Sequence, residues 1–330
     1  MVRPEEVLKE LAQLWIDLGR EEQTEERHGE ASTGVLRACA MTLITIADEA
    51  EDPANVGETI ALLMREHPSR SVVIRMRPAG ECLESRVFAQ CWMPFGQRRQ
   101  ICCEQIEITA GSANLNDIPP VVLPLAVPDL PVILWIRSPR LVESPAFPKI
   151  AGMSNKVILD AAAFHGSKQA LLLLHSKIRT DRLFADLAWS RITRWRETIS
   201  QIFANRDILD ALPRIEEAFV RHQNAEPRPE AIYLAAWLQN GLRRAGSKTR
   251  VILKQADGGP VISGVRLAGP GCRIEIECDN SGAVEIRANE ISNRTIFPEA
   301  TDYLALREEL SISTRDPAFD AAVATAVTLL

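Results

Sequence analysis

Residues 33–76 read TGVLRACAMTLITIADEAEDPANVGETIALLMREHPSRSVVIRM, and this stretch decides the fold class. Its first part, Thr33 to Ala47, alternates apolar with other residues and predicts a strand. Asn55 to Arg65 carries apolar residues at helical spacing, and Ser71 to Met76 is a short apolar strand. A strand, a helix and a second strand in this order predict a parallel pair of strands with a right-handed crossover.

The residues that follow extend the predicted sheet. Two alternating runs, Glu81 to Pro94 and Arg98 to Ala110, flank the turn sequence Pro94-Phe95-Gly96-Gln97. This pattern predicts an antiparallel hairpin, which makes the sheet mixed. Further apolar strands are expected at Val132 to Trp135 and at Lys156 to Leu159, and they start a second α/β region.

Both ends of the chain have patterns of their own. Pro4 to Leu18 predicts an amphipathic helix, and the polar run GREEQTEERHGEAST after it is expected to be an exposed linker. Thr249 to Phe297 consists of short alternating segments separated by Gly and Pro, which predicts an antiparallel meander. Two helices, Ala300 to Leu310 and Asp316 to Leu330, are expected to close the chain.

These patterns predict a mixed α/β (α+β) protein with four segments. Residues 1–30 are the N-terminal helix and linker, and residues 31–116 are an N-terminal α/β domain with the hairpin. Residues 117–248 are a central α/β region, and residues 249–330 are a β-rich segment with terminal helices. The sequence leaves open whether the last two segments form one unit.

Composition excludes several classes of protein. The 330 residues carry a net charge of −6, which argues against a nucleic-acid partner because such proteins carry a basic footprint. No apolar run is long enough to cross a bilayer, so we expect no membrane partner. The first residues, MVRPEEVLKELAQLW, interleave charges with apolar residues and do not form a secretory signal. The cytoplasm is the expected location.

Seven cysteines are present, and their spacing fits no Cys-x-x-Cys motif and no zinc site. We therefore expect buried, reduced thiols. Cys102 and Cys103 are adjacent, so in a strand their side chains point to opposite faces and do not bridge. Cys272 and Cys278 share a strand face but lie too far apart along one strand to bridge directly.

The chemistry-bearing residues form no catalytic motif. The five histidines have no His-Glu-x-x-His spacing, and no Gly-x-Ser-x-Gly elbow or glycine-rich nucleotide fingerprint occurs. We therefore expect no metal and no cofactor. Asp129 and Asp160 lie near strand ends, where α/β enzymes place acids, but each is a single carboxylate without a visible partner.

Two arginines, Arg137 and Arg140, follow the strand that ends at Trp135. Cations at the carboxyl end of such a strand resemble an anion site that would suit a phosphate. A solvated loop carrying two arginines is the other interpretation. The first interpretation supports an alternative function, a sugar-phosphate- or nucleotide-binding α/β enzyme.

The most unusual run is DLAWSRITRWRE, residues 186–197, which holds two tryptophans and three arginines. Ser190 is expected to cap a helix that runs to about Ala204. Trp and Arg are the residues that protein interfaces use as anchors. Trp189, Arg191, Trp195 and Arg196 are therefore candidate partner-binding residues. A core helix with solvated arginines is the alternative, and the sequence leaves both open.

The run DLAWSRITRWRETISQIF resembles the signature of the glucose-6-phosphate dehydrogenase assembly protein family, OpcA. The stretches LRACAMTLITIAD, EHPSRSVVI, LPLAVPDLPVILW and AIYLAAWLQNGL agree in order and spacing. The resemblance covers about Leu36 to Leu242, with a looser match to the end. One departure is Ile136, where family members often have a second Trp after Trp135.

The resemblance implies a non-catalytic accessory protein. Its partner would be glucose-6-phosphate dehydrogenase, in the oxidative pentose phosphate pathway, which it would activate or assemble. Such an activator must bind the active state of its target more tightly than the inactive state. A structural domain without a specific partner is a third possibility, and the sequence leaves the oligomeric state open.

Overall fold

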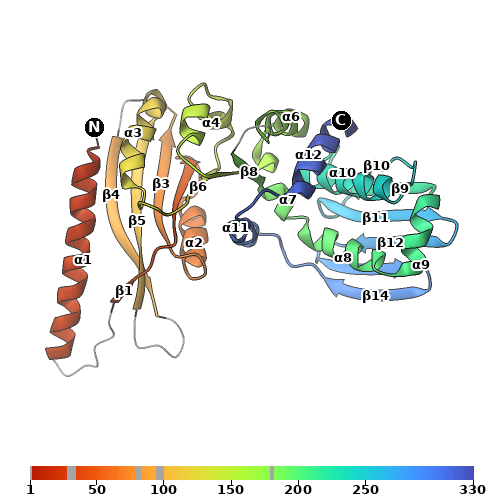
Figure 1. Ribbon diagram of the computed structural model, residues 1–330, viewed down its shortest axis with the longest axis horizontal. Coiled ribbons are helices and arrows are strands. Elements are labelled where there is room, and N and C mark those ends of the chain that lie inside the picture. Colours follow the sequence, from red (N-terminus) through yellow and green to blue (C-terminus); the bar gives the residue numbers. More distant parts are fainter. Residues whose placement is uncertain (1, 28–34, 79, 81–82, 94–99, 179–181) are drawn as a thin grey trace. The chain divides into compact units, whose positions relative to one another are not determined.

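The structure is a computed structural model, and it describes residues 2–27, 35–78, 80, 83–93, 100–178 and 182–330 (Figure 1). Contacts between residues divide the chain into two units, Met1–Leu159 and Asp160–Leu330. The boundary falls inside the region 117–248. Each unit contains a sheet with helices, so the predicted mixed α/β class is confirmed.

Unit 1 is built on a largely parallel sheet. Its strands are β1 (Val35–Arg37), β2 (Met41–Asp48), β3 (Ser69–Arg77), β4 (Leu83–Trp92), β5 (Gln100–Gly111), β6 (Val132–Ile136) and β7 (Lys156–Leu159). They lie in the order β1-β5-β3-β2-β6-β7, and β4 pairs with β5. The predicted parallel pair is confirmed, because Met41 of β2 lies opposite Ser69 of β3. The predicted hairpin of β4 and β5 is also confirmed, while its turn lies outside the described residues.

The single strand expected from Thr33 to Ala47 is wrong, because the described part of this run forms two strands. β1 pairs with β5, whereas β2 pairs with β3 and β6. Since β3 lies between β5 and β2, the chain must pass the end of β3 between them. The Ala40 amide donates to the Pro68 carbonyl at 2.7 Å during that passage. Residues 38–40, between β1 and β2, are small and continue the apolar pattern. The alternation alone therefore does not reveal that the strand ends and a new one begins.

The helices of unit 1 are α1 (Pro4–Arg27), α2 (Pro53–Met64), α3 (Ile118–Val122), α4 (Pro139–Glu143) and α5 (Phe147–Ala151). The predicted helix over Asn55 to Arg65 corresponds to α2. Asp52 caps α2, because its carboxylate accepts from the Ala54 amide at 2.9 Å.

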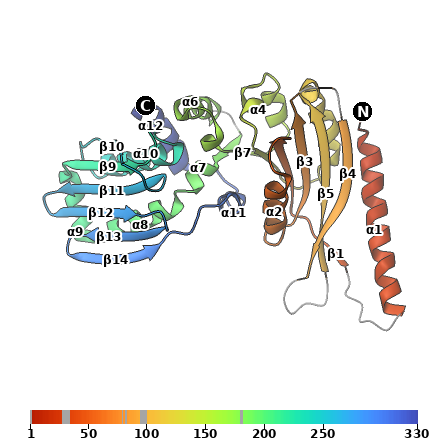
Figure 2. The same cartoon turned by 180° about the vertical axis from the view of Figure 1, so that it is seen from behind.

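The N-terminal helix α1 runs alongside β4 and buries Val7 and Leu11 (Figures 1 and 2). The Trp15 indole N–H donates to Glu104 Oε1 at 2.6 Å, and Arg70 Nε donates to Glu104 Oε2 at 2.5 Å. This buried carboxylate therefore connects α1 to the central strands. The helix continues to Arg27, so the linker expected from Gly19 onward is wrong as far as Arg27.

Unit 2 contains a six-stranded sheet in the order β10-β9-β11-β12-β13-β14. Its strands are β9 (Glu217–His222), β10 (Ile252–Gln255), β11 (Ile262–Gly269), β12 (Cys272–Cys278), β13 (Ala283–Ala288) and β14 (Ile291–Ile296), and β8 (Leu183–Asp186) precedes them. The predicted meander is confirmed for β11 to β14. It is wrong for β10, which pairs parallel with β9. Helix α10 (Pro229–Arg244) connects these two strands, and parallel neighbours need such a crossover.

The remaining helices of unit 2 are α6 (Ser167–Ile178), α7 (Leu187–Ser190), α8 (Thr193–Phe203), α9 (Arg206–Ala211), α11 (Asp302–Ser311) and α12 (Pro317–Leu329). α12 packs against α6 and α10. The two predicted terminal helices therefore correspond to α11 and α12. One sheet face carries neighbouring charges of opposite sign, with Arg266 lying 3.3 Å from Glu217 and 3.7 Å from Glu275.

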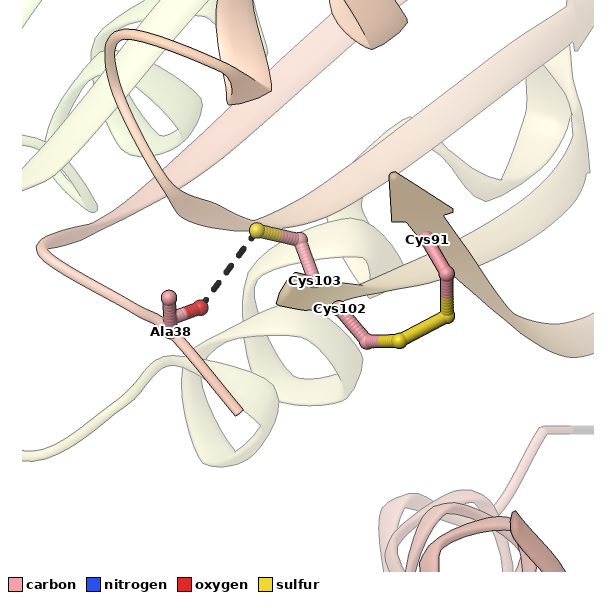
Figure 3. Close-up of a disulfide and its surroundings, with 4 residues drawn as sticks. All are labelled: Ala38, Cys91, Cys102 and Cys103. Atoms are coloured by element: carbon pink, nitrogen blue, oxygen red, sulfur yellow. Dashed lines mark hydrogen bonds between the residues drawn. A yellow bond between two sulfur atoms is a disulfide. The ribbon is translucent and has the colours of Figure 1, made fainter. Parts of the chain in front are cut away.

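A disulfide joins Cys91 of β4 to Cys102 of β5 (Figure 3). The two residues are direct cross-strand neighbours with Cα atoms 4.1 Å apart. The expectation of reduced thiols throughout is therefore wrong for this pair, because hairpin pairing brings together cysteines 11 positions apart. Cys103 points away from the disulfide, as expected, and its thiol donates to the Ala38 carbonyl.

Among the described residues, no helix is long and apolar enough to cross a membrane.

Candidate functional site

The Trp/Arg run forms two short helices in place of one long helix. Asp186 begins α7, since its carboxylate accepts from the Ala188 amide at 3.0 Å. The chain breaks at Arg191 and Ile192, and α8 follows. The prediction that Ser190 caps the helix is wrong. Its hydroxyl donates to Glu309 Oε1 of α11 at 2.6 Å instead.

Arg191 lies at this break and binds three carboxylates of unit 2. Its Nη1 and Nη2 donate to the two carboxylate oxygens of Asp160 at 2.8 and 2.7 Å, and Nη2 also lies 2.7 Å from Asp302. Glu230 is 3.8 Å away. Burial alone would lower the pKa of Arg191, but the hydrogen bonds and charges of Asp160 and Asp302 outweigh burial and raise it. The guanidinium therefore remains charged and joins three segments of the unit.

Asp186 is fully buried beside this cluster. Its Oδ1 accepts from the Ala161 and Ala188 amides at 3.0 Å, and its Oδ2 accepts from the Tyr233 hydroxyl at 2.7 Å. Burial, together with the negative charge of Asp160, raises the pKa of the Asp186 carboxyl to about 7. Burial and Asp186 likewise raise the pKa of Tyr233. The Asp186 carboxyl therefore titrates near neutral pH.

Trp189 is an interior residue whose ring is packed by aromatic side chains and whose indole N–H is hydrogen-bonded. Its ring packs against Tyr233 and Phe319 with centroids 6.0 and 5.8 Å away. Its indole N–H donates to Asp316 Oδ2 at 3.0 Å. The guanidinium of Arg196 lies 3.8 Å from the ring centroid, which is the geometry of a cation–π contact. Burial lowers the pKa of Arg196.

A cleft of about 1340 Å³ opens in front of this cluster. The first turn of α8, α11 and one end of strands β11 to β14 form its walls, and we call it the α8–α11 cleft. Trp195 packs edge-on against Phe297 in its wall, with ring centroids 5.2 Å apart. Arg194 and Glu197 lie at the cleft as an exposed ion pair at 3.0 Å. The cleft thus combines an aromatic wall with charges of both signs.

The four candidate partner-binding residues lie together in unit 2, but they are mostly buried. Trp189 is 2% exposed and Trp195 is 6% exposed, and the side chains of Arg191 and Arg196 are 14% and 17% exposed. Their role as partner contacts stays a prediction. The more accessible residue of the run is Arg194, whose side chain is 65% exposed.

Sequence reasoning missed the groups that hold Arg191. Asp302 is more than 100 positions away, and only the fold brings it to Arg191. A usable signal existed for Asp160, which follows a predicted strand as a carboxylate without a partner. Its partner proves to be Arg191.

The two anion-binding candidates lie in unit 1, where the strand order reverses between β2 and β6. Ligands of open α/β sheets bind at such a point, outside the carboxyl ends of the strands. Here Arg137 forms an ion pair with Glu51, and its guanidinium lies 4.7 Å from the centroid of the Trp135 ring. Arg140 lines a small cavity of about 230 Å³.

Further internal pairs occupy the same edge of the sheet. The Ser138 hydroxyl donates to Asp48 at 2.9 Å, and Arg77 Nε donates to Glu49 at 2.8 Å. Three carboxylates therefore lie within four residues at the end of β2, at Asp48, Glu49 and Glu51. A phosphate placed here would meet negative charge, whereas dinucleotide-binding folds present glycines and a helix N-terminus at this position.

Two family models match the chain in succession. Residues 61–176 match the model described as glucose-6-phosphate dehydrogenase subunit N-terminal domain, and residues 182–323 match the corresponding C-terminal domain. Both models carry the OpcA name, and together they span most of the chain. The chain belongs to the OpcA family.

Curated OpcA relatives agree with this membership. The chain is 26% identical over 196 residues to the OxPP cycle protein OpcA of Synechocystis sp., a match that covers 58% of this chain and 40% of that protein. It is 27% identical over 142 residues to the OpcA of Nostoc punctiforme, covering 43% of this chain and 30% of the relative. The chain thus spans two fifths or less of the length of these relatives.

A solved structure shares the fold. An oxidoreductase from Sinorhizobium meliloti superimposes with a TM-score of 0.50 at 10% sequence identity, covering 88% of this chain and 96% of that chain. At this identity the likeness concerns the fold alone. The OpcA membership therefore rests on the family models and the curated relatives.

Proposed function

We propose that this protein is a non-catalytic accessory protein that binds glucose-6-phosphate dehydrogenase and promotes its assembly or its active conformation. The observation that carries the proposal is the succession of two OpcA models over residues 61–176 and 182–323. Binding that favours one state of the dehydrogenase over another is sufficient for activation. The accessory protein then needs an interaction surface and no catalytic group of its own.

In unit 1, internal side-chain pairs occupy the sheet edge at which dinucleotide-binding folds hold their ligand. This occupation supports a role without a bound nucleotide. At this edge Asp48 accepts a hydrogen bond from Ser138, and Glu51 forms an ion pair with Arg137. A bound phosphate would have to displace Glu51 from Arg137 and would lie near two further carboxylates. The Arg137–Glu51 pair is only partly exposed to solvent, and separating such a pair costs free energy, so the internal pairs oppose anion binding here.

The α8–α11 cleft is the surface that we propose for contact with the dehydrogenase. Interfaces combine aromatic anchors with a polar rim, and the cleft offers Trp195 and Phe297 beside Arg194 and Glu197. The buried cluster around Arg191 fixes the break between α7 and α8 and so orients the first turn of α8. In this account the Trp/Arg run shapes the contact surface, and its exposed members make the contact.

The test measures binding of the purified protein to the dehydrogenase of the same host by sedimentation velocity. The informative variant is the double exchange Arg194→Glu with Glu197→Arg, which inverts the charge pattern of the cleft while keeping an i,i+3 ion pair. We expect at least about tenfold weaker binding, because like charges would face each other at the interface.

A matched control is available on α9. Arg206 and Asp210 form an exposed pair outside the cleft, and Arg206→Glu with Asp210→Arg should leave binding unchanged. If both double exchanges weakened binding equally, the cleft would not be the contact surface. If the unmodified protein formed no complex with the dehydrogenase, this result would contradict the proposed function itself.

The alternative function, a sugar-phosphate- or nucleotide-binding enzyme that uses Arg137 and Arg140, rests on the small cavity beside Arg140. A thermal-shift screen with sugar phosphates and nucleotides tests it. A stabilisation that disappears in Arg140→Ala would favour this alternative, and a flat response would remove it.

A further inference from the structure

The outer strand of the unit 2 sheet, β14, has an open edge. All six of its residues are exposed, and Ile291 and Ile296 are 62% and 72% exposed. Both views show β14 as the last strand of its sheet (Figures 1 and 2). An exposed edge strand presents unpaired N–H and C=O groups that can pair with another strand.

The pairing of β14 with β13 decides which backbone groups face outward. The Phe297 amide donates to the Gly282 carbonyl at 2.8 Å, and the register then alternates along the strand. Residues 291, 293 and 295 therefore direct their N–H and C=O groups toward β13. The N–H and C=O groups of Ser292, Arg294 and Ile296 point away from the sheet. In the single chain the Arg294 amide donates to the Asn293 side-chain oxygen at 2.8 Å, and pairing with a second strand would replace this bond.

The edge lacks the features that usually prevent strand pairing. Proteins protect edges with proline, several charges or a bulge. β14 contains no proline, has Arg294 as its single charge, and keeps an unbroken register with β13. Its isoleucines lie at the two ends of the strand and are among the most exposed large apolar residues described.

We propose that β14 pairs antiparallel with β14 of a second copy of this chain, with Asn293 of the two copies lying opposite each other on a twofold axis. The two six-stranded sheets would then form one continuous sheet. The interface is isologous, since the same strand contributes on both sides. This inference is independent of the proposed contact with the dehydrogenase.

The register follows from backbone direction and charge. Residues whose backbone groups point outward must lie opposite residues of the same kind, which restricts a twofold pairing to a few registers. Centring on Arg294 would place two guanidinium groups opposite each other, and like charges opposite each other are unfavourable. Centring on Asn293 places Ser292 opposite Arg294 and Ile291 opposite Thr295, and it keeps almost the whole strand paired.

Side chains on both faces fit this register. On one face, Ile291 lies beside Thr295 of the second copy, so an exposed apolar side chain gains a β-branched neighbour. On the other face, Arg294 lies across from Ser292 of the second copy and diagonal to Glu290 of the second copy. Within its own chain Arg294 is 3.8 Å from Glu285, so its charge retains an acidic partner.

A cysteine placed on the axis tests both the pairing and its register. In the proposed ladder Asn293 forms a non-hydrogen-bonded pair, in which Cα atoms are about 4.5 Å apart, and this separation permits a disulfide. We expect Asn293→Cys to form a cross-linked dimer under mild oxidation, well above the unmodified chain. Thr295→Cys is the matched control, because residue 295 lies opposite residue 291.

Two results would overturn the proposal as stated. One is equal cross-linking of Asn293→Cys and Thr295→Cys. The other is stronger cross-linking of Arg294→Cys, which would indicate a different register. Sedimentation equilibrium tests self-association without any cysteine substitution. If the unmodified chain stayed monomeric up to near-millimolar concentration, this result would also contradict the pairing.

Asn293→Lys provides a variant that keeps the fold. The substitution places two ammonium groups opposite each other only if the proposed dimer forms, because residue 293 is exposed in the single chain. We expect about tenfold weaker self-association than for Asn293→Gln, with the same thermal unfolding midpoint for both variants. Equal self-association of the two variants would contradict the register.

Discussion

Arg191 and Asp160 form a two-pronged ion pair in which both terminal nitrogens of the guanidinium donate to the two carboxylate oxygens, at 2.8 and 2.7 Å. Asp160 begins unit 2, and Arg191 occupies the break between α7 and α8. Asp302 at the start of α11 joins the same guanidinium. One side chain therefore ties together three parts of the unit that are far apart in sequence.

The first prediction concerns the stability of unit 2. Arg191→Ala should lower the free energy of unfolding by about 3 kcal/mol, because it leaves the carboxylates of Asp160 and Asp302 without their shared cation. Arg191→Lys should recover only part of this loss, since an ammonium group cannot make the two-pronged pair. Chemical denaturation followed by tryptophan fluorescence measures both variants.

The control for this prediction is Arg194→Ala, three residues along the chain. Its side chain is 65% exposed, and exposed ion pairs contribute at most about 1 kcal/mol. If Arg191→Ala were no more destabilising than Arg194→Ala, the Arg191 cluster would not hold the unit together.

The second prediction concerns pH and Asp186. Burial raises the folded-state pKa of this carboxyl to about 7, whereas in unfolded chains an aspartate titrates near 3.9. Between these values the folded state holds the proton more tightly, so the contribution of Asp186 to stability decreases as pH rises toward 7. Above the folded-state pKa the contribution no longer changes with pH.

Asp186→Asn isolates this contribution because its side chain does not titrate. The amide can keep the oxygen that accepts from Ala161 and Ala188 and can donate to the Tyr233 hydroxyl. The variant should gain stability relative to the unmodified protein as pH rises from 5 to neutrality, measured by urea unfolding at each pH. A difference in stability that is the same at pH 5 and pH 8 would show that Asp186 titrates normally.

The third prediction concerns the Cys91–Cys102 disulfide of unit 1. A crosslink between residues 11 positions apart should stabilise the folded unit by about 2–3 kcal/mol, by restricting the unfolded chain. Replacing both cysteines with alanine should lower the unfolding midpoint of unit 1 by a corresponding amount. Cys278→Ala, outside this unit, serves as the control.

The presence of the crosslink can be checked directly. Alkylation of the unfolded protein should add two more groups after reduction than before it, and the double alanine variant should lose this difference. An unchanged alkylation count on reduction would mean that the thiols are free.

Much of the fold could be predicted because local pattern reports local structure. Strands β3 and β7 and helix α2 were expected close to their observed bounds, since each has an apolar pattern with the right period. The run over Thr33 to Ala47 misled because alternation continues through small residues while the chain changes neighbours. β10 misled because its parallel pairing depends on the long crossover through α10.

The site was less predictable than the fold. Composition marked the run from Asp186 to Glu197, but it did not reveal that Arg191 binds Asp160 and Asp302. Charge partners on distant segments have no local periodicity, so nothing in the sequence pointed to Asp302, and Asp160 was marked only as a carboxylate after a predicted strand. The hairpin disulfide was missed as well. A turn at Pro94 to Gln97 would place Cys91 opposite Gln100, whereas the observed register pairs Cys91 with Cys102.

The central proposal is that this protein changes the activity of glucose-6-phosphate dehydrogenase and does not itself turn over a substrate. The most direct measurement is the initial rate of the dehydrogenase of the same host against glucose 6-phosphate concentration, with and without the purified protein, together with the rate of the purified protein alone. We predict a lower KM or a higher kcat in the mixture and no rate for the protein alone. An unchanged rate curve in the mixture, or turnover by the protein alone, would contradict the claim.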